Sequence, residues 1–294
     1  MIKSLLSKIT EGLLKSNIYI SLAAVFLTIE SQIQLGLNPQ WHPYLFLIFF
    51  ATLFEYNIHR FVTIITNTDA LNSIKHNWVK ENKYTFYVLV LFSVAGFIAV
   101  TFLAKKVVLI TLAPIALLTL FYSLPVSGNK TYIFRLREIP YLKIFLIASV
   151  WSSATILLPA IQSEQSFSKV HVMTMLLERF FFIFSITIPF DIRDIEADKQ
   201  AGLKTIPLLL DEKKSIFISN LSLGIFFTIA AFHYSILKDW HILLAMGISA
   251  ITTLLFLNNK KIRNLPYYHY GILDGTMLLQ GILVTGLYYL ILQV

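Results

Sequence analysis

The sequence predicts an all-α polytopic membrane protein with about nine transmembrane helices in one bundle. Hydrophobic residues make up 56% of its 294 positions and charged residues 14%, and the mean hydropathy is +0.71. These values lie outside the range of soluble globular domains. Apolar runs of about 20 residues, the length that crosses a bilayer, recur along the whole chain. The connections between them are too short for a separate soluble domain, so residues 1–294 are predicted to form a single membrane domain.

The predicted spans follow one another with short polar connections. In helices as apolar as these the 3.6-residue periodicity is weak, so the length of each run defines it better than its amphipathicity. The boundaries are set to within about two to four residues. The spans cover residues 17–37, 43–65, 84–104, 107–124, 141–161, 171–190, 215–237, 239–258 and 271–292.

Residues 1–16 precede the first span and have a different pattern. Their apolar side chains recur at helical spacing with lysines between them: Ile2, Leu5, Leu6, Ile9 and Leu13. No apolar core with a small-residue cleavage site follows, so the segment is not a secretory signal. It is predicted to be an interfacial amphipathic helix that leads into the first span. The sequence contains no cysteine, which excludes disulfides and thiolate metal sites.

The basic residues predict the orientation in the membrane. With nine spans, the N-terminus and the connections after spans 2, 4, 6 and 8 share one side, and 19 of the 24 lysines and arginines fall there. The positive-inside rule makes this the cytoplasmic side and places the C-terminus opposite. The formal net charge of +8 therefore reflects topology and contact with anionic membrane lipids. The sequence shows no nucleic-acid-binding module.

An acid cluster follows the sixth span, in the stretch PFDIRDIEADKQAGLKTIP. Asp191, Asp194 and Asp198 are spaced i, i+3 and i+7, which on a continuous helix places them on one face. Three carboxylates on one face repel one another unless a cation or basic side chains neutralise them. Such oxygen ligands suit Mg²⁺, which binds through one or two carboxylates together with substrate phosphates. The alternative is a polar helix end that marks the membrane boundary.

The spacing DxxDxxxD followed by GxxTxP resembles the second aspartate-rich motif of the UbiA superfamily of intramembrane prenyltransferases. The matching residues are Asp191, Asp194, Asp198, Gly202, Thr205 and Pro207. The segment FYSLP, from Phe121 to Pro125, is similar to the Tyr-Ser-x-x-Pro segment of that family. The resemblance covers essentially the whole chain and implies a helical bundle around a central cavity, with the motif on the cytoplasmic side.

Members of that family transfer a prenyl group from a prenyl diphosphate to an aromatic or other acceptor. The resemblance therefore implies Mg²⁺ as cofactor, a prenyl diphosphate as donor and a lipid-soluble, aromatic or quinone-precursor acceptor. It makes Asp191, Asp194 and Asp198 metal ligands, the first two of them catalytic. Basic side chains would stabilise the charge that develops on the leaving group. The candidate diphosphate and substrate contacts are Tyr122, Lys130, Arg135, Arg137, Lys143, Lys199 and Lys204, although the positive-inside rule alone explains any one of the basic residues.

The first acid motif of the family, NDxxDxxxD after the second helix, is degenerate. Aligning Asn57 with the asparagine of the motif puts apolar residues at its three aspartate positions: Ile58, Phe61 and Ile65. None of these side chains binds a metal. The polar residues that remain in or near this segment are Glu55, Asn57, His59, Arg60 and Asp69.

Three interpretations of the degenerate motif are open. In the first, Arg60 is catalytic, replacing one Mg²⁺ at the diphosphate, with Asn57 and His59 as further substrate contacts. In the second, Glu55 or Asp69 retains one metal. In the third, catalysis is lost, and the chain is a silent homologue that binds isoprenoid or quinone and serves a partner protein. The structural alternative pairs Glu55 and Arg60 with each other or with the aspartates.

Four further ionisable residues fall inside spans: Glu30, Glu178, Arg179 and Asp274. Charges at that depth require partners. We expect structural roles for the first three, whereas Asp274 opens the last span at the rim of the same cavity.

Overall fold

The computed structural model describes residues 10–66, 78–79, 81–123, 139, 141–200 and 202–292, and its regular structure there is helical. Within these ranges nine helices have 17 residues or more: α2 (Ile18–Gln34), α3 (Pro43–Thr66), α5 (Lys83–Thr101), α6 (Lys106–Ser123), α7 (Leu142–Gln162), α8 (Lys169–Arg193), α10 (Ile206–Leu237), α11 (Trp240–Asn258) and α13 (Asp274–Leu292). Each overlaps one predicted span. Six of them are long and apolar enough to cross a membrane, and α2 and α6 are shorter apolar helices. The all-α, multi-pass membrane fold is thereby confirmed.

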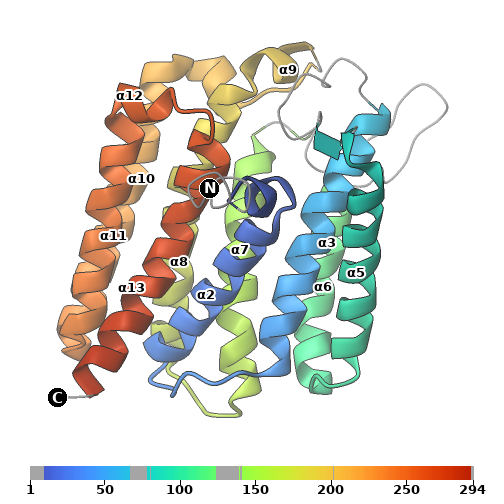
Figure 1. The fold of residues 1–294 in the computed structure, drawn as a ribbon. Coiled ribbons are helices and arrows are strands. Elements are labelled where there is room, and N and C mark those ends of the chain that lie inside the picture. The colour runs from blue at the N-terminus through green and yellow to red at the C-terminus, as the bar shows by residue number, and fades with distance from the viewer. Residues whose placement is uncertain are drawn as a thin grey trace, which may run out of the picture.

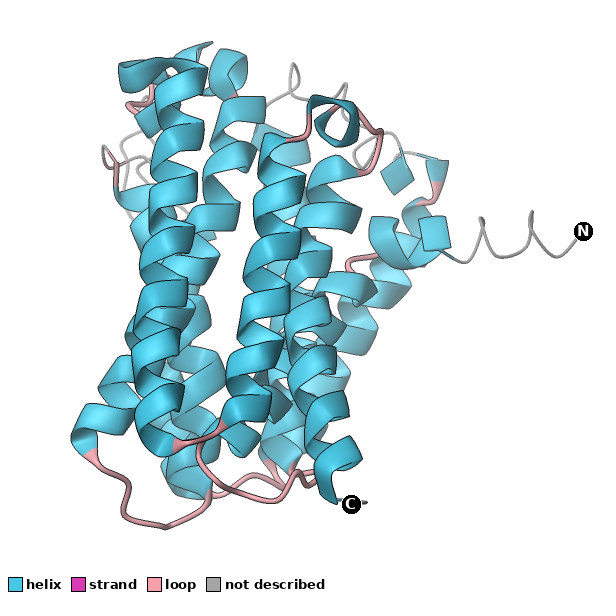
Figure 2. Ribbon diagram, turned by 90° about the vertical axis from the view of Figure 1, so that its left-hand side faces the viewer, coloured by secondary structure: helices cyan, strands magenta, loops and turns pink. Residues whose placement is uncertain are grey.

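The long helices stand side by side in one bundle (Figures 1 and 2). α2, α3, α6, α7, α8, α10, α11 and α13 each pack against the next, and α13 returns to α2. α5 lies against α3 outside this ring. α2 also contacts α7, and 13 of its 17 residues are buried. This burial shows that α2 lies inside the bundle, with neighbours on most of its sides.

Short elements gather at one end of the bundle, which we call the aspartate end because α8 finishes there. They are α9 (Ile195–Gln200), α12 (Lys260–Arg263) and the π-helix η3 (Tyr268–Leu273). Of the predicted interfacial helix, residues 10–15 are helical, and residues 1–9 lie outside the described part of the chain.

The seventh predicted span, from residue 215, corresponds to the second of two segments of α10. α10 begins at Ile206 rather than near residue 215, because it consists of two segments that meet at Asp211. The backbone of Asp211 is not helical there, with φ 70° and ψ 169°. Its Oδ1 accepts a hydrogen bond from the Lys214 amide (3.0 Å), which caps the second segment as an N-cap aspartate does. The segment that crosses the bundle therefore starts after Asp211.

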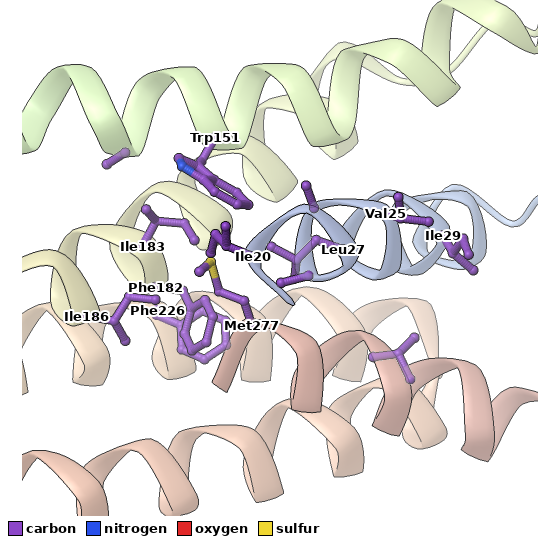
Figure 3. Close-up of a cluster of buried hydrophobic side chains, with 14 of the residues drawn as sticks. Ile20, Val25, Leu27, Ile29, Trp151, Phe182, Ile183, Ile186, Phe226 and Met277 are labelled. Carbon is purple, nitrogen blue, oxygen red and sulfur yellow. The ribbon is translucent and has the colours of Figure 1, made fainter. Parts of the chain in front are cut away.

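The apolar core lies where α2, α7, α8, α10 and α13 meet. Figure 3 shows Ile20, Trp151, Ile183 and Met277 pointing toward one another from four of these helices. In lipid, where apolar side chains gain little by leaving the solvent, close packing of this kind holds helices together.

The ionisable residues inside the spans find partners across helices. Arg179 Nη2 lies 2.7 Å from Glu30 Oε1, which also accepts a hydrogen bond from Gln280 Nε2 (2.9 Å). Glu178 Oε1 lies 2.5 Å from His233 Nδ1. These contacts join α8 to α2 and α10, and α2 to α13, which agrees with the structural roles expected for Glu30, Glu178 and Arg179.

Close approach of α13 to α2 requires a glycine at position 281. A Cβ there would meet the backbone carbon and oxygen of Phe26 at 2.7 Å. We expect Gly281→Ala to destabilise the protein by about 1–3 kcal/mol, because backbone atoms cannot move aside as a side chain can. Gly286→Ala is the matched control on the same helix, where nothing lies within 4 Å of an added Cβ. Its unfolding midpoint in detergent should equal or slightly exceed that of the wild type, and equal midpoints for the two variants would contradict the close contact.

Candidate functional site

The aspartates of the acid cluster lie where α8 ends. The helix finishes at Arg193, Asp194 is its C-cap residue with φ −92° and ψ 6°, and α9 starts at Ile195. The expectation that all three aspartates share one face of a continuous helix is therefore wrong, because the backbone leaves helical geometry at Asp194. The turn after α9 uses Gly202 at φ +69°, a conformation that favours glycine.

Two of the three aspartates converge on one lysine. Lys143 Nζ, in the first turn of α7, lies 2.7 Å from Asp191 Oδ1 and 3.5 Å from Asp198 Oδ2. All three residues are buried, with exposed fractions of 9% for Lys143, 1% for Asp191 and 3% for Asp198. One ammonium thus faces two carboxylates in a buried place, and two carboxylates held close together are suited to bind a cation.

Asp194 has a different partner. Arg193 donates to both of its carboxylate oxygens, from Nε at 2.7 Å and from Nη2 at 2.8 Å. The guanidinium also lies over the rings of Phe190 and Tyr270, at 5.3 Å and 5.0 Å from their centroids. Burial raises the pKa of Asp194, but the hydrogen bonds and charge of Arg193 outweigh it and hold that pKa below its usual value. Asp194 is therefore ionised at neutral pH.

The carboxylates fit a Mg²⁺ ion only in part. The described residues contain no group of three His, Asp or Glu side chains placed to hold a metal, so they form no three-carboxylate site by themselves. Asp191 and Asp198 nevertheless present two buried carboxylates to one point. Mg²⁺ commonly uses one or two carboxylates and takes further ligands from substrate phosphates. The donor set therefore fits Mg²⁺ bound jointly with a diphosphate.

The polar residues of α3 hold the turn that leads into α2. Arg60 donates from Nη1 to the Lys15 carbonyl (2.6 Å) and from Nη2 to Asn17 Oδ1 (2.7 Å). Asn17 Nδ2 donates to Asn57 Oδ1 (3.1 Å), and Asn57 Nδ2 donates to the Ser16 carbonyl (3.2 Å). Asn17 has φ +67°, so the backbone leaves helical geometry there, between the helical residues 10–15 and α2. We name this set of contacts the Asn17 clamp.

The Asn17 clamp changes the interpretation of the degenerate motif. Asn57 and Arg60 are buried, with exposed fractions of 0% and 5%. Their hydrogen bonds in the described part of the chain go to residues 15–17 and to the Leu53 carbonyl. The structural alternative paired Arg60 with Glu55 or with the aspartates. Within the described residues, the hydrogen bonds of Arg60 go instead to the turn at residues 15–17. The sequence signal for a turn at this place is the Ser16-Asn17 pair just before a span, since both residue types favour helix starts.

Other polar side chains gather at the same end of the bundle. The rings of His59 and Tyr122 stack with centroids 6.2 Å apart, which brings α3 and α6 together. Tyr122 lies within electrostatic range of Lys143 and of Tyr56, and Tyr56 within that of Asp274. The aspartate end is thus one polar region to which α3, α6, α7 and α13 all contribute.

Two further predicted contacts, on α9 and in the turn after it, lie at the same end of the bundle. Lys199 and Lys204 are exposed. Four of the predicted residues lie outside the described part of the chain: Asp69, Lys130, Arg135 and Arg137.

A double-mutant cycle tests the Asn17 clamp. Arg60→Met removes two charge-assisted hydrogen bonds and leaves buried acceptors, so it should cost about 2–4 kcal/mol of unfolding free energy. Asn17→Ala keeps the guanidinium but removes its partner, and it should reproduce much of this loss. The double variant should be less destabilised than the sum of the two by about 1 kcal/mol or more, measured by unfolding in detergent. Strict additivity would show that the two side chains act independently.

Comparisons with known proteins agree with this fold and motif. The sequence model of the UbiA prenyltransferase family matches residues 79–265, a range that includes the aspartates and begins after α3. No curated protein matches the chain. A UbiA homologue from Archaeoglobus fulgidus, solved with GPP and Mg²⁺, is 15% identical over 92% of this chain and 99% of that chain, with a TM-score of 0.58.

Two further solved structures are similar. A UbiA homologue from Aeropyrum pernix K1 is 14% identical over 94% of this chain and 98% of that chain, with a TM-score of 0.59. The structure of a digeranylgeranylglyceryl phosphate synthase is 16% identical over 94% of this chain and 98% of that chain, with a TM-score of 0.53. These likenesses show the fold, and the family match spans more than half of the sequence. The chain therefore belongs to the UbiA prenyltransferase family.

Proposed function

We propose that the protein is a Mg²⁺-dependent membrane prenyltransferase that moves a prenyl group from a prenyl diphosphate to a lipid-soluble acceptor of the aromatic or quinone-precursor class. The observation that carries the proposal is the buried meeting of Asp191, Asp198 and Lys143 at the end of a membrane helix. Ionisable groups in such a place are costly and are retained mainly for function. Support also comes from the homologue that was solved with GPP and Mg²⁺.

The side chains of the aspartate end would divide the work. Asp191 and Asp198 would hold the metal together with the diphosphate, and Asp194 would join them by exchanging Arg193 for the ion. Lys143 would turn its ammonium from the carboxylates to the diphosphate oxygens. Bound Mg²⁺ supplies charge stabilisation of the diphosphate leaving group. The breaking C–O bond leaves its electron pair on the diphosphate, and the allylic carbon then bonds to the acceptor, which loses a proton.

Substrate contacts would come from several other residues of this region. His59 and Tyr122, stacked on each other, would border the diphosphate or the first isoprene unit. Arg137, which lies outside the described residues, and Lys199, on α9, stay in the proposal as basic contacts of the diphosphate. We assign Asn57 and Arg60 a positioning role instead, because they hold the Asn17 clamp.

The aspartate end would face the cytoplasm. The end of α8, α9, the start of α10, α12 and the connections between them carry several basic residues: Arg193, Lys199, Lys204, Lys213, Lys214, Lys260, Lys261 and Arg263. The positive-inside rule favours the cytoplasmic side for such connections. The N-terminus would share that side, and the C-terminus would lie opposite.

The Asn17 clamp also favours a second candidate function. A guanidinium held by Lys15 and Asn17 cannot serve a diphosphate without releasing that turn, so Arg60 as it stands is not a second diphosphate anchor. The alternative is a catalytically silent homologue that binds isoprenoid or quinone for a partner protein. Such a protein would bind an isoprenoid without needing Mg²⁺.

The test uses the purified full chain in detergent and prenyl diphosphates of several lengths. We expect diphosphate to be released slowly in the presence of Mg²⁺, with at least one chain length preferred, and the release to stop when EDTA removes the metal. Binding of isoprenoids without any turnover, unchanged by EDTA, would instead establish the silent homologue.

A further inference from the structure

A concave site lies at the aspartate end. It is a groove of about 300 Å³ between the end of α8, the start of α10, α12 and η3. Its polar lining residues are Arg193, Glu212, Lys260, Arg263, Asn264 and His269. Neither Lys143 nor the three aspartates line it, but Arg193 does and also pairs with Asp194, so it adjoins the proposed catalytic region. We call it the basic groove.

The charges of the basic groove suit an anion. Three cationic side chains line it against one carboxylate, that of Glu212, which pairs with Arg263. Lys260 is exposed and has no ion pair within the described residues. Asp194 takes Nε and Nη2 of Arg193, which leaves Nη1 without a described hydrogen-bond partner. Guanidinium and ammonium groups with donors to spare are the usual binders of phosphate oxygens.

The position of the basic groove favours a lipid over a soluble anion. Its lining residues stand at the ends of membrane-spanning helices: Arg193 closes α8, Lys260 follows α11, and His269 precedes α13. This is the level of the lipid headgroups. Apolar residues near its lining residues in the sequence are exposed: Leu265, which follows Asn264, at 48%, and Leu209, three residues before Glu212, at 65%. A ligand with both a phosphate and acyl chains satisfies both surfaces.

We propose that the basic groove is a binding site for the headgroup phosphate of an anionic phospholipid, with Lys260, Arg263 and Arg193 as its contacts. Basic pockets between membrane helices are suited to such headgroups, and each nearby lysine or arginine strengthens binding about fivefold. Glu212 opposes the phosphate and sets a limit on the affinity. The proposal does not depend on prenyl transfer, because Lys260 and Arg263, two of its three phosphate contacts, have no part in the proposed catalysis.

The test titrates short-chain phosphatidylglycerol into the purified full chain in a neutral detergent. Phosphatidylcholine with the same acyl chains and inorganic phosphate serve as comparison ligands. We expect the wild type to prefer phosphatidylglycerol to phosphatidylcholine by about fivefold or more. Lys260→Gln combined with Arg263→Gln should abolish this preference. Glu212→Gln should tighten binding about fivefold, so the groove is tested by changes of both signs even if one variant folds poorly.

The matched control is Lys213→Gln combined with Lys214→Gln, which removes the same charge from the same end of the molecule but outside the groove. It should keep most of the preference for phosphatidylglycerol. An equal loss in the two double variants would show diffuse attraction to the whole surface and overturn the proposed site. Equal binding of the two lipids would overturn it as well. Displacement of the lipid by inorganic phosphate at equal concentration would overturn the lipid assignment in favour of a soluble phosphate.

Discussion

Replacing Asp191 by asparagine should lower Mg²⁺-dependent turnover of prenyl diphosphate about 100-fold or more. Asp191 is the carboxylate with the shorter contact to Lys143 and is 1% exposed, so no water can replace it as a ligand without rearrangement. Metal-based stabilisation of a leaving group contributes several kcal/mol, and each 1.4 kcal/mol of lost stabilisation is a factor of about ten in rate. The concentration of Mg²⁺ that gives half-maximal turnover should rise in the same variant.

The matched control for Asp191→Asn is Glu196→Gln. Glu196 belongs to the same acid cluster but is exposed on α9. The turnover and the Mg²⁺ dependence of Glu196→Gln should therefore stay close to those of the wild type. Turnover is compared per mole of folded protein, because Asp191→Asn also removes a partner of the buried Lys143 and so affects folding. Equal activity in the two variants would contradict the assignment of Asp191.

Replacing Arg179 by methionine should cost about 3–5 kcal/mol of unfolding free energy. The guanidinium is 2% exposed and holds Glu30 at 2.7 Å, and it also donates to the Leu27 carbonyl and to Gln34. Its removal leaves a buried carboxylate with Gln280 as its hydrogen-bonding partner. An uncompensated charge of this kind is among the most destabilising changes in a protein interior.

The control that separates charge from packing adds Glu30→Gln to Arg179→Met. The double variant carries no unpaired carboxylate, so it should regain about 1–2 kcal/mol relative to the single variant when both are unfolded in detergent micelles. A double variant as unstable as the sum of the two single changes would show that packing, rather than the ion pair, is what Arg179 supplies.

The fold could be predicted from the sequence largely because span length is a strong signal. Each of the nine predicted spans overlaps one long helix within the described residues. The start of α10 could not be predicted, because the break at Asp211 depends on a local cap and a positive φ. The π-helix η3, at residues 268–273, also had no sequence signal, since it continues directly into α13.

The candidate site was predicted less completely, and the reason is the sequence separation of its contacts. The spacing of the acid cluster pointed to the aspartates but not to the break at Asp194. Lys143 lies 55 residues from Asp198 in the sequence, and Arg60 lies 43 residues from Asn17. Nothing local in the sequence fixes such pairs, so the interpretation of Arg60 required the structure.

The most direct test of this account measures the affinity for a prenyl diphosphate with and without Mg²⁺, in the wild type, Asp191→Asn and Arg60→Met. We predict that Mg²⁺ tightens binding to the wild type at least about tenfold, as expected for an ion held by protein and phosphate together. Asp191→Asn should lose this dependence, whereas folded Arg60→Met should keep it. The reverse pattern, with the Mg²⁺ effect retained in Asp191→Asn and lost in Arg60→Met, would contradict the placement of the metal at the aspartate end.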